Sequence, residues 1–352
     1  MKKSLILASV ALLAMTVSCD LFKNTFKEQD VKVNETSNVA ADEFIGLKDN
    51  KYASVNPQGD LTVEAPAEKS IIFAMDYAKP KSLVPESLVI SGKDLPEISK
   101  PENGEAPEIA GILISVKNPA DTPVEMEASL KVDAATMAAL PPVIIPAGGE
   151  TKILYSKDDI NNNLPTLDNP DDIVVVPDMK ANNFGKPFQS IEISGITFSP
   201  SKTKAAAPAG ENGQIEINAK YCALLSFPKG TTITIHQTFH DLNVHLDRLS
   251  EYTFNKYAIT LNVTNTLPFD ILASAKNADG ITAVADKAAK AGSTGNPVTS
   301  TVIVTVTDNS GKKVSDIETA DLTLTLTAAV DGAKIPKDVK VTIDVDKITP
   351  LD

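Results

Sequence analysis

Hydrophobic and polar residues alternate with a period of two along much of the chain beyond residue 45. The alternation is clearest in TVIVTVT at 301–307 and in DLTLTLTAAV at 321–330, where aliphatic residues alternate with Thr. Such alternation predicts strands with one buried face. The sequence DNSGKK at 308–313 predicts a hairpin turn between these two strands, because Asp, Asn and Gly tolerate turn geometry. The sequence DAATMAAL at 133–140 predicts at most a short turn of helix.

Three segments recur in the same order along the chain. The matched pairs are GDLTVEA at 59–65 with GQIEINA at 213–219, the segment 112–131 with 259–276, and IEISGIT at 191–197 with IDVDKIT at 343–349. The second match places Asn118 on Asn265 and Pro123 on Pro268. All three pairs are separated by about 150 residues, an ordinary size for one domain. The matches therefore predict two copies of one domain.

Many short strands with Pro-rich and Gly-rich turns predict an all-β protein made of two tandem β-sandwich domains. We expect an immunoglobulin-like or Greek-key arrangement related by internal duplication, although the immunoglobulin Cys pair and core Trp are missing. The predicted organisation is a signal peptide at 1–18, a flexible tether at 19–45, a first sandwich at 46–200, a linker at 201–212 and a second sandwich at 213–352.

The first residues have the parts of an export signal. Lys2 and Lys3 precede an apolar run from Leu5 to Val17, and small Ser18 precedes Cys19. The run is shorter than the ~20 residues that a membrane-spanning helix needs, which favours a removed signal. These residues resemble a bacterial lipoprotein signal of the Bacteroidota type. The resemblance implies acylation of Cys19 and attachment to a membrane. The alternative is an ordinary secretory signal cut near Thr16 or Ser18.

The segment after Cys19 is polar and lacks apolar periodicity, which is typical of a flexible tether. Within it, FKEQD at 26–30 is similar to the surface-export tag of Bacteroidota lipoproteins. The resemblance implies an outer-membrane protein, lipid-anchored and exposed at the cell surface.

Charge and cysteine content limit the partners and the stabilising bonds that we expect for this chain. The chain has 33 basic and 46 acidic residues, and removal of Lys2 and Lys3 makes it more negative still. An acidic surface repels nucleic acid and anionic lipid, so we expect no nucleic-acid partner. Besides Cys19 the chain holds one cysteine, Cys222 in KYCALLSF. We expect Cys222 to be a small buried apolar residue, and no disulfide to stabilise the fold.

The sequence contains no Gly-x-Ser-x-Gly elbow, phosphate-binding Gly-rich loop or His-Glu-x-x-His motif, so we predict a protein that is not an enzyme and that carries no cofactor. All three histidines, His236, His240 and His245, fall within one short stretch. In a strand His236 and His240 share a face, which makes them weak candidates for metal ligands, whereas His245 points to the other face. The run 156–172 is rich in Asn and Asp. It predicts a solvated loop, with calcium binding as the alternative.

Two functions from different classes remain. The first is an adhesive or structural surface module with a protein or glycan partner at the cell surface. It is similar in architecture to the fimbrillin class of Bacteroidota, which combines a lipoprotein signal with two β-sandwich domains. Those pilins are matured by cleavage after an early Arg, whereas the single Arg of this chain is Arg248. We therefore do not expect polymerisation by that route.

The alternative is a glycan-binding or nutrient-binding lipoprotein of an uptake system. Sugar rings are commonly held against aromatic faces. The chain has no Trp, six Tyr and eleven Phe, so a platform would have to be made of tyrosine. An exposed cluster of Tyr52, Tyr77 and Tyr155, or of Tyr252 and Tyr257, would favour this alternative.

Overall fold

The computed structural model describes residues 31–47, 50–93, 95–100, 109–133, 135–156, 173–176, 188–201, 212–239, 256–277, 280–308, 319–337 and 339–351. They form two compact units. The split unit takes its described residues from the ranges 31–50 and 227–352, and the inserted unit takes its described residues from 51–226. The inserted unit thus interrupts the sequence of the split unit.

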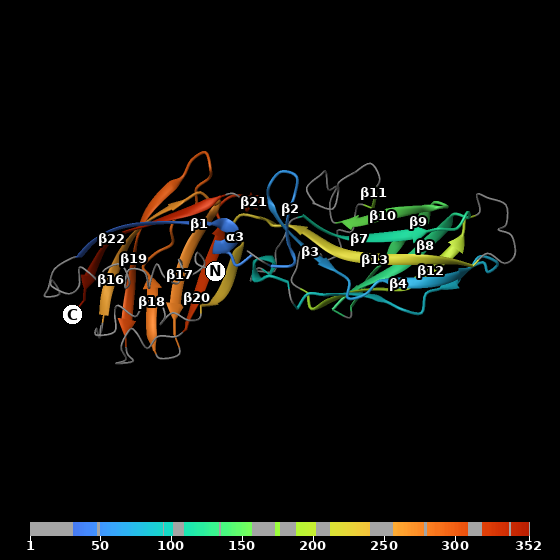
Figure 1. Cartoon of the computed structure of the whole chain (residues 1–352), viewed down its shortest axis with the longest axis horizontal. Coiled ribbons are helices and arrows are strands. Elements are labelled where there is room, and N and C mark those ends of the chain that lie inside the picture. Colours follow the sequence, from blue (N-terminus) through green and yellow to red (C-terminus); the bar gives the residue numbers. More distant parts are fainter. Residues whose placement is uncertain are drawn as a thin grey trace. The chain divides into compact units, whose positions relative to one another are not determined.

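The split unit is built around one antiparallel sheet. Its elements are β1 (Val31–Ala40), α3 (Ala41–Phe44), β15 (Thr232–Phe239), β16 (Lys256–Asn265), β17 (Phe269–Lys276), β18 (Ile281–Ala285), β19 (Val298–Asp308), β20 (Ala320–Ala328), β21 (Ala333–Lys334) and β22 (Lys340–Pro350). Eight strands pair in the order β1-β22-β16-β19-β18-β17-β20-β15, and the sheet curls around its apolar face (Figure 1). Blue β1 and red β22 lie side by side, so strands from opposite ends of the sequence pair (Figure 1).

The inserted unit contains two sheets. Its elements are β2 (Ala53–Val55), β3 (Leu61–Pro66), β4 (Ile71–Asp76), β5 (Ser82–Leu83), β6 (Leu88–Ser91), a 3₁₀ turn (Glu97–Ser99), β7 (Ile109–Asn118), β8 (Val124–Val132), β9 (Ala135–Ile145), β10 (Gly149–Ser156), β11 (Ile173–Val176), β12 (Ser190–Pro200) and β13 (Asn212–Leu224), after which β14 (Ser226–Phe227) leads into the split unit. One sheet has the order β11-β10-β7-β13-β3-β2, with β4 also on β13. The other has the order β5-β12-β8-β9, with β6 also on β12. Only the β10–β11 pair is parallel among the described strand pairs.

Both units share one strand order. In the inserted unit β3 and β4 follow each other along β13, and β5 and β6 follow each other along β12, so each pair acts as one interrupted strand. When β2, β11, β14 and β21 are left out of the count, the first strand of each unit pairs with the eighth, the eighth with the third, and the third with the sixth. The second pairs with the seventh, the seventh with the fourth, and the fourth with the fifth. This interleaved double Greek key is a jelly roll.

The all-β prediction is confirmed, but the arrangement differs from the predicted immunoglobulin-like tandem. In an immunoglobulin sandwich the first two strands pair with each other, whereas here the first strand pairs with the last. The units are also nested instead of consecutive, since β1 lies within the predicted tether 19–45 and belongs to the split unit. This polar segment is a strand because β22 offers it a hydrogen-bonding edge and the sheet buries Val39 and Ala41.

Several local predictions change for the same topological reason. The predicted hairpin at 301–330 does not form, because β19 pairs with β16 and β18 whereas β20 pairs with β15 and β17. The repeat match between 59–65 and 213–219 joins neighbouring strands of one unit, since β3 pairs with β13. Residues 135–140 of the segment expected to form a turn of helix belong to strand β9. Asp133 before it has a positive φ of 51° and accepts hydrogen bonds from the amides of Gln189 and Ser190.

One repeat match does join equivalent strands, at 112–131 and 259–276, and its two asparagines make three equivalent hydrogen bonds. Asn118 ends β7, and its Nδ2 donates to the carbonyls of Thr122 and Pro146. Asn265 ends β16, and its Nδ2 donates to the carbonyls of Phe269 and Lys290. Each Oδ1 accepts the amide two residues later, and both side chains are fully buried. The asparagine thus fixes the crossing from the third to the fourth strand in each unit.

Candidate functional site

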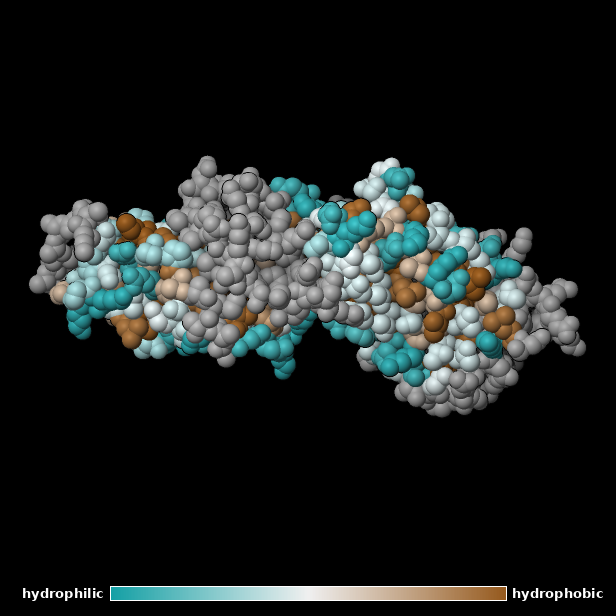
Figure 2. All heavy atoms as spheres, turned by 180° about the vertical axis from the view of Figure 1, so that it is seen from behind, coloured by the Kyte–Doolittle hydropathy of each residue, from teal (hydrophilic) through white to brown (hydrophobic). Residues whose placement is uncertain are grey.

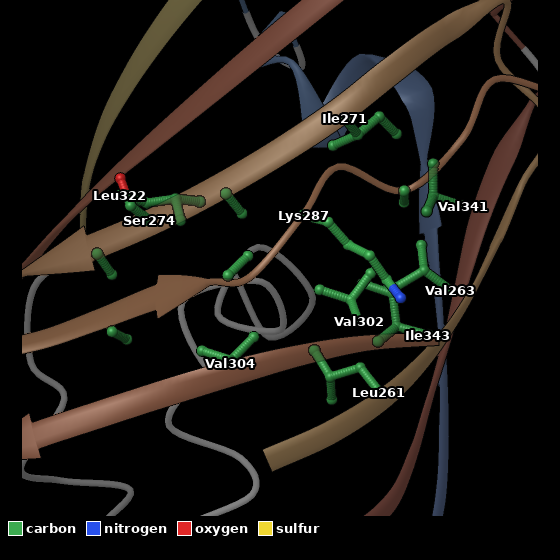
Figure 3. A pocket seen from close by; sticks show the side chains of 15 residues that line it. Leu261, Val263, Ile271, Ser274, Lys287, Val302, Val304, Leu322, Val341 and Ile343 are labelled. Atoms are coloured by element: carbon green, nitrogen blue, oxygen red, sulfur yellow. The ribbon is translucent and has the colours of Figure 1, made fainter. Parts of the chain in front are cut away.

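An apolar cavity of about 70 Å³ lies inside the curled sheet of the split unit (Figure 3). Its wall draws on strands from both halves of the sheet. The lining residues are Leu261, Val263, Ile271, Ala273, Ser274, Ala275, Ala283, Ala285, Lys287, Ala289, Val302, Val304, Leu322, Val341 and Ile343. Five of them are alanines on β17, on β18 and just after β18, so the wall is made of short side chains where the two halves face each other.

The sheet register explains why the space is left open. In the inserted unit Tyr155 on β10 pairs with Ile112, and in the split unit Val304 on β19 pairs with Ile259, the residue matched to Ile112 by the repeat. Tyr155 is only 1% exposed and fills the interior of its unit. Val304 at the equivalent position has a much shorter side chain and lines the cavity.

The fourth strand shows the same reduction in volume. Leu130 on β8 is fully buried in the inserted unit, whereas the residue matched to it in the split unit is Ala275 on β17. On the seventh strand Phe198 pairs with Met126, and Leu326 pairs with Ile271, the residue matched to Met126. The inserted unit is therefore packed with larger side chains at three equivalent positions.

Aromatic packing completes the interior of the inserted unit. Phe188 meets Tyr221 edge-on, with ring centroids 5.0 Å apart, and Phe73 stacks with Phe198 at 6.3 Å. Burial raises the pKa of both Tyr155 and Tyr221, so these hydroxyls stay neutral across the physiological range. In the split unit the aromatic pair Phe227 and Phe269 packs at 5.8 Å, and neither ring lines the cavity.

Lys287 is the charged residue of the cavity wall. It follows β18, its residue is exposed, and in Figure 3 its side chain points across the cavity toward the side of Val263 and Ile343. Nearby Lys290 forms an ion pair with Asp270, with Nζ 2.8 Å from the carboxylate. Within the described part of the chain Lys287 makes no ion pair. The site thus combines an aliphatic interior with one ammonium group, which belongs to an exposed residue.

The cavity was not foreseen from the sequence. The alanines of ILASAKNADGITAVADKAAKAG at 271–292 alternate or cluster in a region of strand pattern, which is the signal that could have indicated a thinly filled interior. Alanine alternation does not reveal which strands face each other, so the cavity itself depends on the tertiary arrangement.

The predicted site residues have different outcomes. Cys19, the expected acylation site, lies outside the described residues, as do His240, His245 and residues 157–172 of the candidate calcium loop. His236 lies on β15, opposite Thr323 of β20, and its side chain is exposed. Among the described residues no group of three or more His, Cys, Asp or Glu side chains could hold a metal ion. Cys222 is buried as predicted.

The proposed tyrosine platform does not form from the first cluster. Tyr77 is 5% exposed and donates a hydrogen bond to Asn118, and Tyr155 is buried in the core. Tyr52 is half-buried beside the ammonium of Lys51, 4.6 Å from the ring centroid. In the second cluster, Tyr252 and the side chain of Tyr257 lie outside the described part.

Three exposed aliphatic residues lie on neighbouring strands of the split unit. Leu272, Val284 and Ile303 are 39%, 53% and 40% exposed on the neighbouring strands β17, β18 and β19. On the face drawn in Figure 2, apolar residues lie in small groups among polar ones. Within the described residues no helix has the length and apolar character that crossing a membrane requires.

Comparisons with known proteins give one informative likeness. The chain is similar to a protein of Parabacteroides distasonis ATCC 8503 described as "a putative secreted protein", with a TM-score of 0.50, 16% identity, and coverage of 93% of this chain and 100% of that one. A structure of infectious bursal disease virus, strain Gx, has a TM-score of 0.23 and 8% identity, covers 82% of this chain and 41% of that one, and supports no argument. No family model matches the chain, and no curated protein is significantly similar in sequence. The likeness is one of fold: over most of its length the chain resembles a Bacteroidota protein described in these words.

Proposed function

We propose that the chain is a non-enzymatic, lipid-anchored binding protein of a Bacteroidota-type cell envelope, whose split unit takes a small apolar ligand. The observation that carries this proposal is the aliphatic cavity between the two halves of the curled sheet (Figure 3). Apolar, partly enclosed cavities are the usual form of small-molecule sites. The burial of Tyr77 and Tyr155 favours an apolar ligand over a sugar held on an aromatic platform.

Ligand binding can be tested with 1-hexanol on the mature chain carrying Cys19→Ser. We expect 1-hexanol to shift the methyl resonances of Ala275 and Ala283 in NMR spectra, because both line the cavity. Ala275→Leu should abolish the shifts by filling the space. Shifts that are absent in the wild type, or that persist in Ala275→Leu, would contradict the proposed site.

The anchor and its location are the second part of the proposal. The resemblance of residues 1–19 to a lipoprotein signal supports acylation of Cys19, with Cys222 as a matched control since it is buried. Cys19→Ser should remove incorporation of labelled palmitate, whereas Cys222→Ser should retain it. Protease shaving of intact cells should remove the chain if it is exposed at the outer surface. Protection of the full-length chain would place it inside the envelope.

An adhesive role is the second candidate, supported by Leu272, Val284 and Ile303. These residues form a small apolar group on three neighbouring strands, in which Val284 is displaced by two residues along β18 from the level of Leu272 and Ile303. Exposed apolar groups are typical of contact surfaces. Val284→Lys should reduce adhesion of cells that display the protein. Thr301→Lys, on the same strand as Ile303, is the control. Equal adhesion of the two variants would argue against this role.

Internal duplication is also part of the proposal. The common strand order and the equivalent hydrogen bonds of Asn118 and Asn265 support descent of both units from one jelly roll.

A further inference from the structure

We propose that the ligand of the split-unit cavity is an aliphatic carboxylate, with its alkyl chain inside the cavity and its carboxylate paired with Lys287. This inference rests on the proposed binding function and adds the chemical class of the ligand. It is carried by the composition of the cavity wall, by the position of Lys287 and by the way its segment is held.

The wall determines the buried part of the ligand. Apart from Ser274 and Lys287, every lining side chain is an alanine or a larger aliphatic residue. A polar group placed deep in this space would lose its hydrogen bonds to water and find few replacements, which is costly. No aromatic side chain lines the cavity, so stacking on a sugar or a planar ring is not available. The buried part is therefore a short alkyl chain.

The segment that carries Lys287 is held firmly on both sides. Before it, the amide of Asp286 donates to the carbonyl of Ile303 at 2.9 Å, and the Asp286 carboxylate accepts the amide of Ile303 at 2.8 Å. After it, Ala289 and Ile271 exchange two backbone hydrogen bonds, each 2.8 Å long. These contacts tie the segment to β19 on one side and to β17 on the other. Lys287 is thereby held at the cavity, and its segment loses little conformational entropy when a ligand binds.

The ammonium group of Lys287 determines which head group the exposed end of the ligand carries. Lys290, three residues later, is already paired with Asp270, and its backbone carbonyl accepts Asn265. Lys287 lines the apolar wall and is itself exposed, and lysines at such boundaries commonly combine a buried aliphatic stem with an ammonium group in contact with water. A ligand with an alkyl chain and an anionic head group would contact the apolar wall with its chain and the ammonium group with its head group. Carboxylate is the anion that fits a single ammonium, because a phosphate typically recruits several cations or a bidentate arginine.

The test compares hexanoate with 1-hexanol, two probes with the same alkyl chain and different head groups. Binding is measured by NMR titration of the mature chain carrying Cys19→Ser, with Lys287→Met as the main variant. Methionine keeps an unbranched apolar side chain and removes the charge. Lys276→Met, which changes an exposed lysine of β17 outside the cavity wall, is the matched control.

We expect hexanoate to bind about twofold to fivefold more tightly than 1-hexanol, the range of a partly exposed ion pair. Lys287→Met should reduce hexanoate affinity to that of 1-hexanol and leave 1-hexanol unchanged, whereas Lys276→Met should change neither. Added salt should weaken only hexanoate. Equal affinity of the two probes for the wild type, or preference for hexanoate that survives in Lys287→Met, would overturn the carboxylate assignment while the cavity function stands. Absence of binding by both probes would overturn the assignment and the proposed function together.

Discussion

The split unit and the inserted unit follow the same strand order but fill their interiors differently. In the inserted unit Tyr155, Leu130 and Phe198 reach the centre, whereas the equivalent positions of the split unit hold Val304, Ala275 and Leu326. Both units keep the buried asparagine that fixes the turn between the third and fourth strands. The comparison shows that a jelly roll is defined by its strand pairing and turns, and that the volume of its interior can change without altering them.

The largest expected effect concerns β1. This strand precedes the inserted unit in the sequence and pairs with β22 of the split unit. Val39→Asp places a carboxylate in a buried position without a partner and should cost the split unit about 4 kcal/mol or more. Hydrogen exchange followed by mass spectrometry should show lost protection in β22, with the inserted unit unchanged. Asn38→Asp, on the exposed side of the same strand, is the control and should have little effect. Full protection of β22 in Val39→Asp would contradict the role of β1.

Substituting the two matched core residues Leu130 and Ala275 should reverse the difference in interior packing between the units. Leu130→Ala should destabilise the inserted unit by about 2–5 kcal/mol, because it removes buried methyl groups and leaves a cavity. Ala275→Leu fills existing space and should stabilise the split unit by about 1–2 kcal/mol. Denaturant unfolding with hydrogen exchange read out for each unit measures both. Destabilisation by Ala275→Leu would show that the cavity cannot hold the larger side chain.

The turn asparagines should behave alike in the two units. Asn118→Ala and Asn265→Ala each remove two donated hydrogen bonds and one bond accepted from a turn amide at a fully buried site, so each should cost its own unit about 2–3 kcal/mol. Asn118→Ala also removes the bond accepted from the Tyr77 hydroxyl. Asn262→Ala, on the exposed face of β16, loses one hydrogen bond from Thr301 and should cost less than about 1 kcal/mol. A large difference between the two buried substitutions would mean that the turns are not equivalent.

The smallest expected effect concerns a difference between the outer faces of the two units. Glu127 in the inserted unit is matched to Leu272 in the split unit, and its hydrogen bond and charge attraction to Lys81 lower the pKa of its carboxyl. A lowered pKa adds stability that is present above the unfolded value of about 4.3 and is lost as the pH falls through the folded value. Because the pair is exposed, the contribution is small. Lys81→Met should raise the pKa of Glu127 in an NMR titration, whereas Lys79→Met should leave it unchanged.

Much of the fold could be predicted from residue patterns, because burial of one sheet face leaves a period of two in the sequence. That pattern indicated strands at 301–307 and 321–330 and the all-β class. The match of Asn118 with Asn265 identified equivalent turns, because a buried asparagine with two carbonyl partners is a specific requirement. The other repeat matches were misleading, since any two strands with one buried face resemble each other. One of them linked β3 to its own neighbour β13, and the other linked β12 of the inserted unit to β22 of the split unit.

The sequence by itself thus determined the all-β class, the strands at 301–307 and 321–330, and one kind of turn that both units share. Only the tertiary structure decided which strands are neighbours, that β1 belongs with β22, and that Lys287 stands at an apolar cavity. The physical reason is that alternation states which face of a strand is buried, whereas pairing depends on hydrogen bonds between segments that lie far apart in the sequence. The cavity is less visible still, because it results from the summed volumes of side chains on six strands.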